Sequence, residues 1–178
     1  MTIQLGMSNL YFCWCLFWGS GGLVCFLKKN TIIHAICDGK IVYLDDIDDY
    51  AFSHYLIGDG IAIETDQREI YSPCDGIITT IAQSGHAFTM QLKNGIELLI
   101  HIGINHQHHS SEYFHYHIQV GEQVTSQTLI LTLDKNYISL HNHEILIPII
   151  VLNSQEHPIK TMTTSPKVTL GQKILTLK

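Results

Sequence analysis

The sequence predicts an all-β domain, an antiparallel sandwich or barrel with few short helical turns. From residue 31 onward, short runs rich in Val, Ile, Leu and Thr alternate with Gly, Asp and Asn, and no long stretch shows the 3.6-residue period of a helix. Similar runs also recur after the same turn, which favours an internal duplication. The predicted strands, in chain order, are residues 40–44, 60–65, 76–82, 86–92, 96–102, 117–120, 129–133, 144–152 and 173–178.

Two pairs of similar segments support the duplication. "CDGKIVYL" begins at Cys37 and "CDGIITTI" at Cys74, and "VGEQV" at Val120 resembles "LGQKI" at Leu170. Asp-Gly turns are common wherever strands reverse, since glycine adopts positive φ readily, so coincidence remains an alternative. Two such pairs together favour duplication.

Composition limits the classes of partner. The 178 residues are 46% hydrophobic, which is enough for one domain with a core. The net charge is −6 and no basic stripe is present, so nucleic acid is not an expected partner. The acidic run "DDIDD" at Asp45–Asp49 fits a solvated loop, or a docking patch for a basic partner protein.

Residues 1–30 form a leader that differs from the predicted domain, residues 31–178. Residues 1–27 carry no charged side chain, and the apolar stretch 10–27 just reaches the length of a membrane span. A cleaved signal peptide fits poorly, and after insertion Lys28 and Lys29 would keep the domain on the cytoplasmic side. We therefore expect a cytoplasmic domain, free or membrane-associated through residues 10–29. A later translation start is a third alternative.

The clearest local signal is a β-hairpin over residues 86–103, "HAFTMQLKNGIELLIHIG". Asn94-Gly95 is the residue pair that a two-residue type I′ turn prefers. With these two residues as the loop, Lys93 pairs with Ile96.

That register brings two histidines together. It sets Phe88 opposite His101 and His86 opposite Gly103, so that His86, Phe88 and His101 share one face of the sheet. The two histidines are then diagonal neighbours, roughly 7–8 Å apart at the backbone. Apolar residues flank His101 on its strand, which predicts a dry surrounding.

A pair of histidines in such a setting suits phosphoryl transfer. A neutral imidazole is a good nucleophile at neutral pH, and a second imidazole can stabilise phosphoryl oxygens by donating N–H. The plainer alternative is that both rings only fill a sheet face.

At these residues the chain resembles the glucose-type EIIA domain of the bacterial phosphoenolpyruvate-dependent sugar phosphotransferase system. The resemblance runs through Asp38–Ile63, containing "GDGIAI", and Tyr71–Asn105, containing "SPCDG" and the histidine hairpin. It continues more loosely through "VGEQV" and "VTLGQKILTLK", and it spans roughly residues 32–178.

The resemblance implies a compact antiparallel sandwich that carries a phosphoryl group from the phosphocarrier HPr to a cysteine of the EIIB domain of an EIIB/EIIC sugar permease. It implies that His101 is phosphorylated and that His86 stabilises the phosphoryl group. Ser84 matches the hydroxyl residue that orients the phosphorylated ring, and Gly103 matches the position whose carbonyl fixes the second ring. No cofactor is expected. A zinc ion could be held at the two-histidine site but is not predicted.

The resemblance also implies a shallow apolar partner surface with Phe52 and Ile57, and Asp49 at its acidic rim. One departure lies beside it: where the family usually has Asp-Thr and an apolar residue, this chain has Asn105, His106 and Gln107. A lost acidic residue weakens attraction to a basic partner. The family's Gly-Glu-Gly-Phe motif is "SEYF" here.

Two other functions remain open alternatives. A histidine-rich metal-binding protein would use H-x-H spacing, a workable zinc chelate. The histidines concerned are His106, His108, His109, His115, His117, His141 and His143. The five cysteines contain no C-x-x-C pair and indicate neither a disulfide framework nor a thiolate zinc site. A lipoyl- or biotinyl-type carrier would modify Lys135 in a hairpin, although "DKN" also fits an ordinary polar turn.

Overall fold

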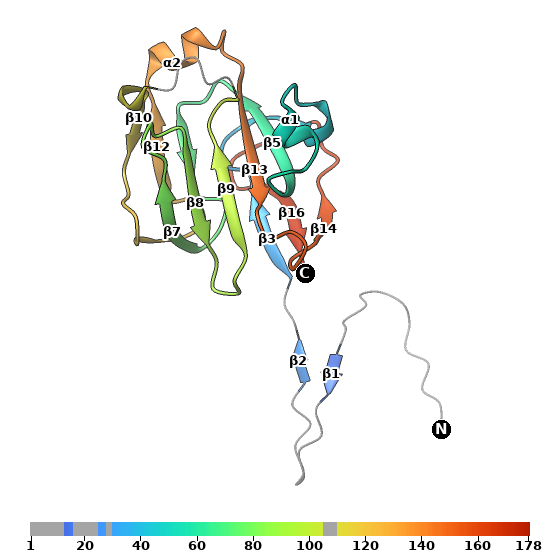
Figure 1. The fold of residues 1–178 in the computed structure, drawn as a ribbon. Coiled ribbons are helices and arrows are strands. Elements are labelled where there is room, and N and C mark those ends of the chain that lie inside the picture. The colour runs from blue at the N-terminus through green and yellow to red at the C-terminus, as the bar shows by residue number, and fades with distance from the viewer. Residues whose placement is uncertain (1–12, 16–24, 28–29, 105–109) are drawn as a thin grey trace, which may run out of the picture.

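The described part of the computed structural model comprises residues 13–15, 25–27, 30–104 and 110–178, and it consists mainly of antiparallel β-sheet (Figure 1). The predicted all-β class is confirmed. The helical elements are η1 (Leu44–Asp46), α1 (Tyr50–Ser53), η3 (Ser111–Tyr113) and α2 (Lys135–Leu140). The strands are β1 (Cys13–Cys15), β2 (Cys25–Leu27), β3 (Thr31–His34), β4 (Gly39–Tyr43), β5 (Asp59–Thr65), β6 (Glu69–Tyr71), β7 (Gly76–Ile81), β8 (Ala87–Gln91), β9 (Glu97–His101), β10 (Phe114–Tyr116), β11 (Gln123–Val124), β12 (Leu129–Leu133), β13 (Ile145–Val151), β14 (Ile159–Met162), β15 (Lys167–Val168) and β16 (Lys173–Leu177).

One large sheet and two small sheets form the sandwich. The eight-stranded sheet has the order β11-β7-β8-β9-β13-β5-β4-β15, and the three-stranded sheets have the orders β10-β12-β6 and β14-β16-β3. The main core lies between them. It contains Leu98 and Ile100 from the large sheet, and Leu131 and Leu175 from the two small ones, all 0% exposed. Burial of this apolar surface is the main force holding the layers together.

A second, smaller cluster lies on the outer face of the large sheet. Because side chains alternate along a strand, residues next to the core residues of β5 and β13 point away from the core. Ala62 and Ile150 are of this kind. They form one cluster with Leu44 of η1, with Ile47 directly after it, and with Phe52 of α1. This outer face carries the site described below.

The internal duplication is visible at the two edges of the large sheet. β11 pairs with β7 through Val124 and Gly76, and β15 pairs with β4 through Val168 and Gly39. The repeated aspartates act alike. Asp75 Oδ1 accepts a hydrogen bond from the backbone N–H of residue 126 at 2.8 Å, and Asp38 Oδ1 accepts one from residue 170 at 2.7 Å. The "CDG" segments are therefore structurally equivalent.

The second pair of similar segments is not equivalent. "VGEQV" leads into β11 at the edge of the large sheet, whereas "LGQKI" leads into β16 in the middle of a small sheet. Both segments contain a tight turn with a positive-φ glycine before a strand, so the likeness is local.

Two further expectations differ from the structure. Residues 117–120 are bends and turn, and the strand lies earlier, at β10, where Phe114 is buried against the core. Residues 135–140 form helix α2, which begins after the N-cap Asp134. Lys135 therefore starts a helix and does not lie in a hairpin, which removes the basis for a lipoyl-type site.

The leader is described only at residues 13–15, 25–27 and 30. The first two of these segments pair as antiparallel strands, with Cys13 opposite Leu27. Within the part of the chain that the structure describes, no helix has the length and apolar character needed to cross a membrane. The expected membrane association through residues 10–29 concerns a stretch that lies largely outside the described residues.

Candidate functional site

His101 ends strand β9 on the outer face of the large sheet. Its side chain is 9% exposed, and Leu99, two residues earlier on the same face, packs against the outer cluster. Ile100 and Ile102, on either side of His101, are 0% exposed and belong to the main core. The predicted apolar surrounding of His101 is confirmed.

The register of the hairpin differs from the expectation by one residue. Ala87 pairs with His101 and Phe88 with Ile100, and the hydrogen bond from the N–H of Leu92 to the carbonyl of Ile96 closes a three-residue loop. Gly95, the third loop residue, has φ +88°, which glycine adopts without a steric penalty. Phe88 therefore points into the core, away from the face of His101.

His86 reaches His101 because it lies outside the regular strand. It occupies a bend directly before β8, and its carbonyl accepts a hydrogen bond from the N–H of Ile102 at 2.7 Å. Side chains of bend residues do not follow the alternation of the strand, so the shifted register does not separate the histidines. The two rings meet edge to face, with centroids 4.8 Å apart and an interplanar angle of 70°.

The hydrogen bonds on the two rings are the reverse of those expected. His101 Nδ1 donates to the carbonyl of Gly103 at 2.6 Å, and Ser84 Oγ lies 2.5 Å from His86 Nδ1. The expectation that Ser84 orients His101 and that Gly103 orients His86 is thus wrong. Nδ1 lies near the base of the imidazole side chain, so it contacts groups that are close in the sequence. Each Nδ1 therefore meets a group two residues away along the chain.

The conformation of Gly103 supports its contact with His101. Gly103 has φ +73°, and its N–H donates to the carbonyl of Leu146 at 2.9 Å, which ties the residue to β13. In a residue with a β-carbon, this left-handed conformation costs roughly 1–2 kcal/mol, because Cβ comes too close to the following carbonyl oxygen. Glycine therefore lets the chain turn here while its carbonyl accepts the hydrogen bond from His101 Nδ1.

Phe52 closes the other side of His101. The two rings meet edge to face with centroids 5.5 Å apart, and Phe52 is 5% exposed. Phe52 lies in α1, whose N-cap is Asp49: its Oδ1 accepts from the N–H of Ala51 at 2.9 Å and of Phe52 at 3.3 Å. Asp49 thus holds the short helix that places Phe52 against His101.

The Asp49 cap can be tested by mutation. We expect Asp49→Ala to lower the free energy of unfolding by about 1 kcal/mol, because two N–H groups of α1 lose their acceptor. The measurement is urea unfolding followed by fluorescence. Asp48→Ala, which changes the exposed neighbour, should stay within about 0.5 kcal/mol of the wild type. Equal losses for both variants would contradict a specific capping role.

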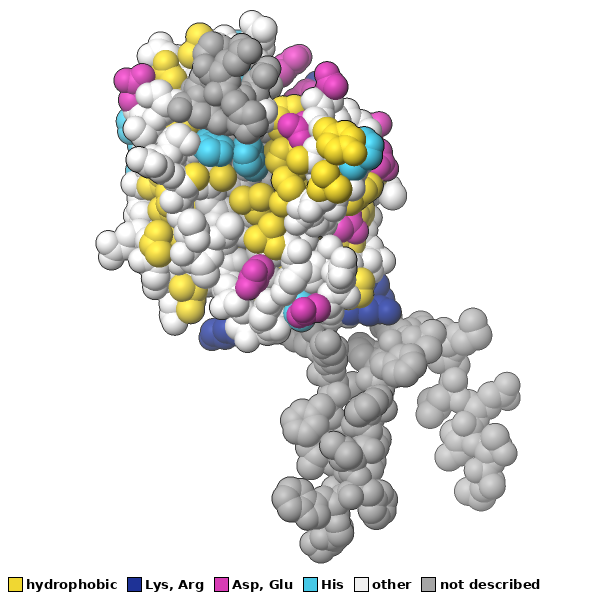
Figure 2. All heavy atoms as spheres, in the orientation of Figure 1, with side chains coloured by type: hydrophobic (Ala, Val, Ile, Leu, Met, Phe, Trp, Pro, Cys, Tyr) yellow, Lys and Arg dark blue, Asp and Glu magenta, His cyan; other side chains and the backbone are white. Residues whose placement is uncertain are grey.

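Phe52 and Ile57, two of the residues predicted to meet partners, belong to the hydrophobic cluster on this face. Phe52 is buried, so the accessible apolar surface comes from partly buried residues around it: Val42, Ile57, Leu99, Ile104 and Leu146. Figure 2 shows histidine side chains beside a continuous area of hydrophobic side chains, with acidic side chains at its border. Asn105 lies outside the described residues.

Two tyrosines near the histidines were missed by the sequence reasoning. The hydroxyl of Tyr116 donates to the carbonyl of Gly85 at 2.8 Å, and that of Tyr137 donates to the carbonyl of Ile102 at 3.1 Å. Burial raises the pKa of both hydroxyls above the usual range, so both remain protonated donors. A polar N-cap at Asp134 was the one available signal, because it predicts the helix that carries Tyr137.

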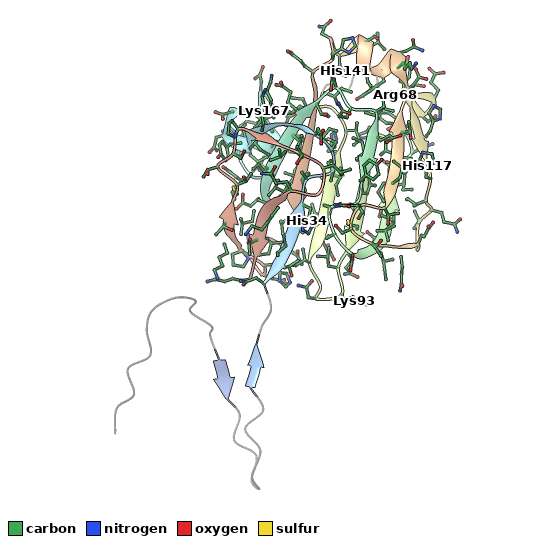
Figure 3. All side chains as sticks on the ribbon, turned by 180° about the vertical axis from the view of Figure 1, so that it is seen from behind. His34, Arg68, Lys93, His117, His141 and Lys167 are labelled. Atoms are coloured by element: carbon green, nitrogen blue, oxygen red, sulfur yellow. The ribbon has the colours of Figure 1, made fainter. Side chains whose placement is uncertain are left out.

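The residues considered for metal binding are dispersed. Figure 3 labels His117 and His141, two of these residues, at separate places on the fold. His117 Nε2 lies 2.8 Å from Thr132 Oγ1, and His141 Nδ1 donates to the carbonyl of Tyr137 at 2.8 Å. Among residues 30–104 and 110–178, no three His, Cys, Asp or Glu side chains are grouped for a metal ion. His106, His108 and His109 lie outside the described residues.

The two described cysteines of the domain do not form a nucleophilic site. Cys37 and Cys74 are buried free thiols, and burial raises the pKa of each to about 12. Both therefore remain protonated at neutral pH and are poor nucleophiles and metal ligands.

Known proteins of one family resemble this chain in sequence and in fold. Residues 31–157 match the family of the phosphoenolpyruvate-dependent sugar phosphotransferase system, EIIA 1. The chain is 34% identical over 137 residues to the glucose-specific EIIA component of Borreliella burgdorferi, which covers 76% of this chain and 72% of that protein. It resembles the solved structure of glucose permease IIA from Mycoplasma capricolum with a TM-score of 0.78 and 29% identity, over 86% of this chain and 99% of that one.

Two longer relatives contain the same domain. The chain is 33% identical over 148 residues to the glucoside-specific EIICBA component of Staphylococcus carnosus, and 35% identical over 133 residues to the glucosamine-specific EIICBA component of Bacillus subtilis. These matches cover 83% and 75% of this chain but only 21% of each relative. The chain therefore corresponds to about a fifth of each permease.

The sandwich fold, the paired imidazoles and these matches define a phosphoryl-carrier domain that acts in sugar uptake. The chain belongs to the EIIA 1 family of the phosphoenolpyruvate-dependent sugar phosphotransferase system. As a component of that system it transfers phosphate through a phosphohistidine, and its partner is a sugar permease.

Proposed function

We propose that His101 Nε2 is the atom that carries the phosphoryl group, received from HPr and delivered to a cysteine of EIIB. The observation behind this assignment is the bond from His101 Nδ1 to the Gly103 carbonyl. A carbonyl oxygen only accepts, so the ring proton resides on Nδ1 and the nucleophilic lone pair on Nε2.

Each transfer to or from His101 forms one bond to phosphorus and breaks another. The Nε2 lone pair attacks phosphorus, the N–P bond forms, and the bond between phosphorus and the donor breaks with its electron pair leaving on the donor. The phosphorylated ring keeps its Nδ1 proton and gains positive charge, which the Gly103 carbonyl stabilises. When a thiolate attacks phosphorus, the N–P bond breaks and its electrons return to Nε2.

His86 is assigned to the phosphoryl oxygens. If the Ser84 hydroxyl donates to His86 Nδ1, the proton of that ring resides on Nε2 and is a donor. The ring lies 4.8 Å from that of His101, within reach of a group attached there. Fixed donors placed before the reaction stabilise developing charge without reorganisation.

The partner surface supports successive docking of two proteins on one face. Phe52 and other apolar side chains lie around the buried His101, and acidic residues flank members of this cluster in the chain: Asp45 follows Leu44, and Asp59 comes two residues after Ile57. This combination fits a protein partner with an apolar centre and a basic rim. We assign HPr and EIIB to this same surface, since both must reach His101. We further assign residues 31–178 as the carrier domain and place it in the cytoplasm, with its phosphoryl donor.

The proposal is tested by incubating the protein with phosphoenolpyruvate, the general enzyme of the system and HPr. The expected product gains one phosphoryl group by mass, loses it in acid, and shows it on His101 after peptide mapping. Absence of the label from the wild type would refute the proposed function, and a label on another histidine would refute the assignment to His101.

Substitution of His86 separates uptake of phosphate from its release. We expect His86→Gln to accept phosphate nearly as well as the wild type, because the nucleophile is intact, and to pass it to EIIB about 100-fold more slowly. The two rates are measured by rapid mixing with phospho-HPr and with EIIB. Unaltered transfer to EIIB would show that His86 has only a packing role.

A further inference from the structure

Strand β10 contacts the turn that carries His86. The hydroxyl of Tyr116, the last residue of β10, donates to the carbonyl of Gly85 at 2.8 Å. Gly85 directly precedes His86 in the chain. The contact joins residues that are 31 positions apart, so it is a tertiary interaction and not a product of local sequence.

The contact is also tightly packed. A β-carbon at Gly85 would lie 2.9 Å from Phe114 Cβ, so the backbone of the turn rests directly on β10. The Tyr116 ring meets Phe88 edge to face at 6.2 Å and 89°. Burial raises the pKa of the Tyr116 hydroxyl, which therefore stays protonated and continues to donate.

These contacts fix the backbone of His86 on both sides. The carbonyl before it is held by Tyr116, and its own carbonyl is held by the N–H of Ile102 at 2.7 Å. With both peptide planes fixed, only the two side-chain torsions of His86 remain, and these meet Ser84 and the His101 ring.

We propose that Tyr116 is a positioning residue for His86: through the Gly85 carbonyl it holds the peptide from which the ring projects toward His101. This inference rests on the proposed function for its effect on transfer, since His86 must meet the phosphoryl oxygens accurately. Small displacements of a reacting group lower rates strongly.

The neighbours of Tyr116 point away from the site. His115 and His117 are exposed, whereas Tyr116 between them is half-buried. Within β10 the side chains of His115 and Tyr116 point to opposite faces because they are successive strand residues. Figure 3 labels His117 at the outer side of the small sheet. Within this stretch, Tyr116 is therefore the residue that contacts the turn carrying His86, between the two exposed histidines His115 and His117.

The test is Tyr116→Phe in the full chain, with Tyr113→Phe as a matched control from the same small sheet region. Tyr113 is also half-buried, and within the described residues its hydroxyl has no hydrogen bond. We expect Tyr116→Phe to take up phosphate within about twofold of the wild type and to transfer it to EIIB about three- to tenfold more slowly, the effect of one lost hydrogen bond. Tyr113→Phe should match the wild type in both.

A second measurement separates positioning from general structural damage. Long-range ¹H–¹⁵N spectra of the unphosphorylated proteins report the ring nitrogens, and the His86 signals should shift in Tyr116→Phe but not in Tyr113→Phe. Normal transfer would overturn the inference, and so would slow transfer with unchanged His86 signals. If the wild type takes up no phosphate, the proposed function fails, while the His86 signals still decide whether Tyr116 positions that ring.

Discussion

Replacing His101 with alanine is expected to reduce phosphate uptake from HPr by more than about a thousandfold, because the nucleophile itself is removed. The amount of label is measured by intact mass after incubation with the complete phosphorylating mixture. No other described histidine combines burial, a fixed Nδ1 proton and a second imidazole at 4.8 Å.

The matched control is His117→Ala. His117 comes from the same histidine-rich stretch but is exposed and lies beside Thr132. This variant should carry as much phosphate as the wild type. Undiminished label on His101→Ala would contradict the assignment, and loss of label in both variants would indicate that uptake depends on the stretch as a whole.

Loss of the fold would not explain the expected loss of label. His101 lies at the end of its strand, where its ring donates a hydrogen bond to Gly103 and contacts the rings of Phe52 and His86. Its removal should lower the free energy of unfolding by about 1–3 kcal/mol. Thermal unfolding of the variant, followed by circular dichroism, checks that it is folded at the assay temperature.

The hairpin shows what local sequence can predict and where it fails. Alternation of apolar residues and the Asn-Gly pair predicted two paired strands, and both are present. The expected loop has two residues and the observed loop has three. Asn-Gly is compatible with both lengths, so this pair alone does not determine the register. The observed register pairs Phe88 with Ile100 and places both side chains in the core. The core is completed by the small sheets, so the local sequence of the hairpin does not reveal this preference.

The proximity of the two histidines was predicted correctly, but from a hairpin register that the structure does not have. His86 and His101 come together as expected, but through a bend and not through the register from which their proximity was predicted. The resemblance identified Ser84 and Gly103 as partners of the two rings but assigned each to the wrong ring, Ser84 to His101 and Gly103 to His86. Only atomic positions show that each group serves the histidine two residues away.

The missed elements share a physical cause. β3, β6, β10 and β14 have three or four residues each, so they contain too few alternations to stand out from loops. Their strand conformation comes from pairing with β12 and β16 and from burial of one face. The tyrosines that hold the site's backbone lie in β10 and α2, elements that the sequence reasoning did not contain.

Tyr137→Ala is expected to lower the free energy of unfolding by about 3–5 kcal/mol, the range for removing a buried aromatic side chain. Tyr137 is 0% exposed, and its ring lies 4.9 Å from that of Phe114 and 4.3 Å from that of His141. Alanine cannot fill this space, and the cavity would lie between α2 and the small sheet. The measurement is denaturant unfolding at equilibrium.

Two companion variants divide this loss into its parts. Tyr137→Phe keeps the ring and removes only the hydrogen bond to the Ile102 carbonyl, so it should cost about 1–2 kcal/mol. Leu140→Ala changes a residue of the same helix that is 46% exposed and should stay within about 0.5 kcal/mol of the wild type. If Ala and Phe at position 137 cost the same, ring packing contributes nothing and the hydrogen bond is the whole effect. A cost that is much larger for Ala means that packing of α2 against the small sheet, more than the bond to the residue beside His101, keeps this end of the site in place.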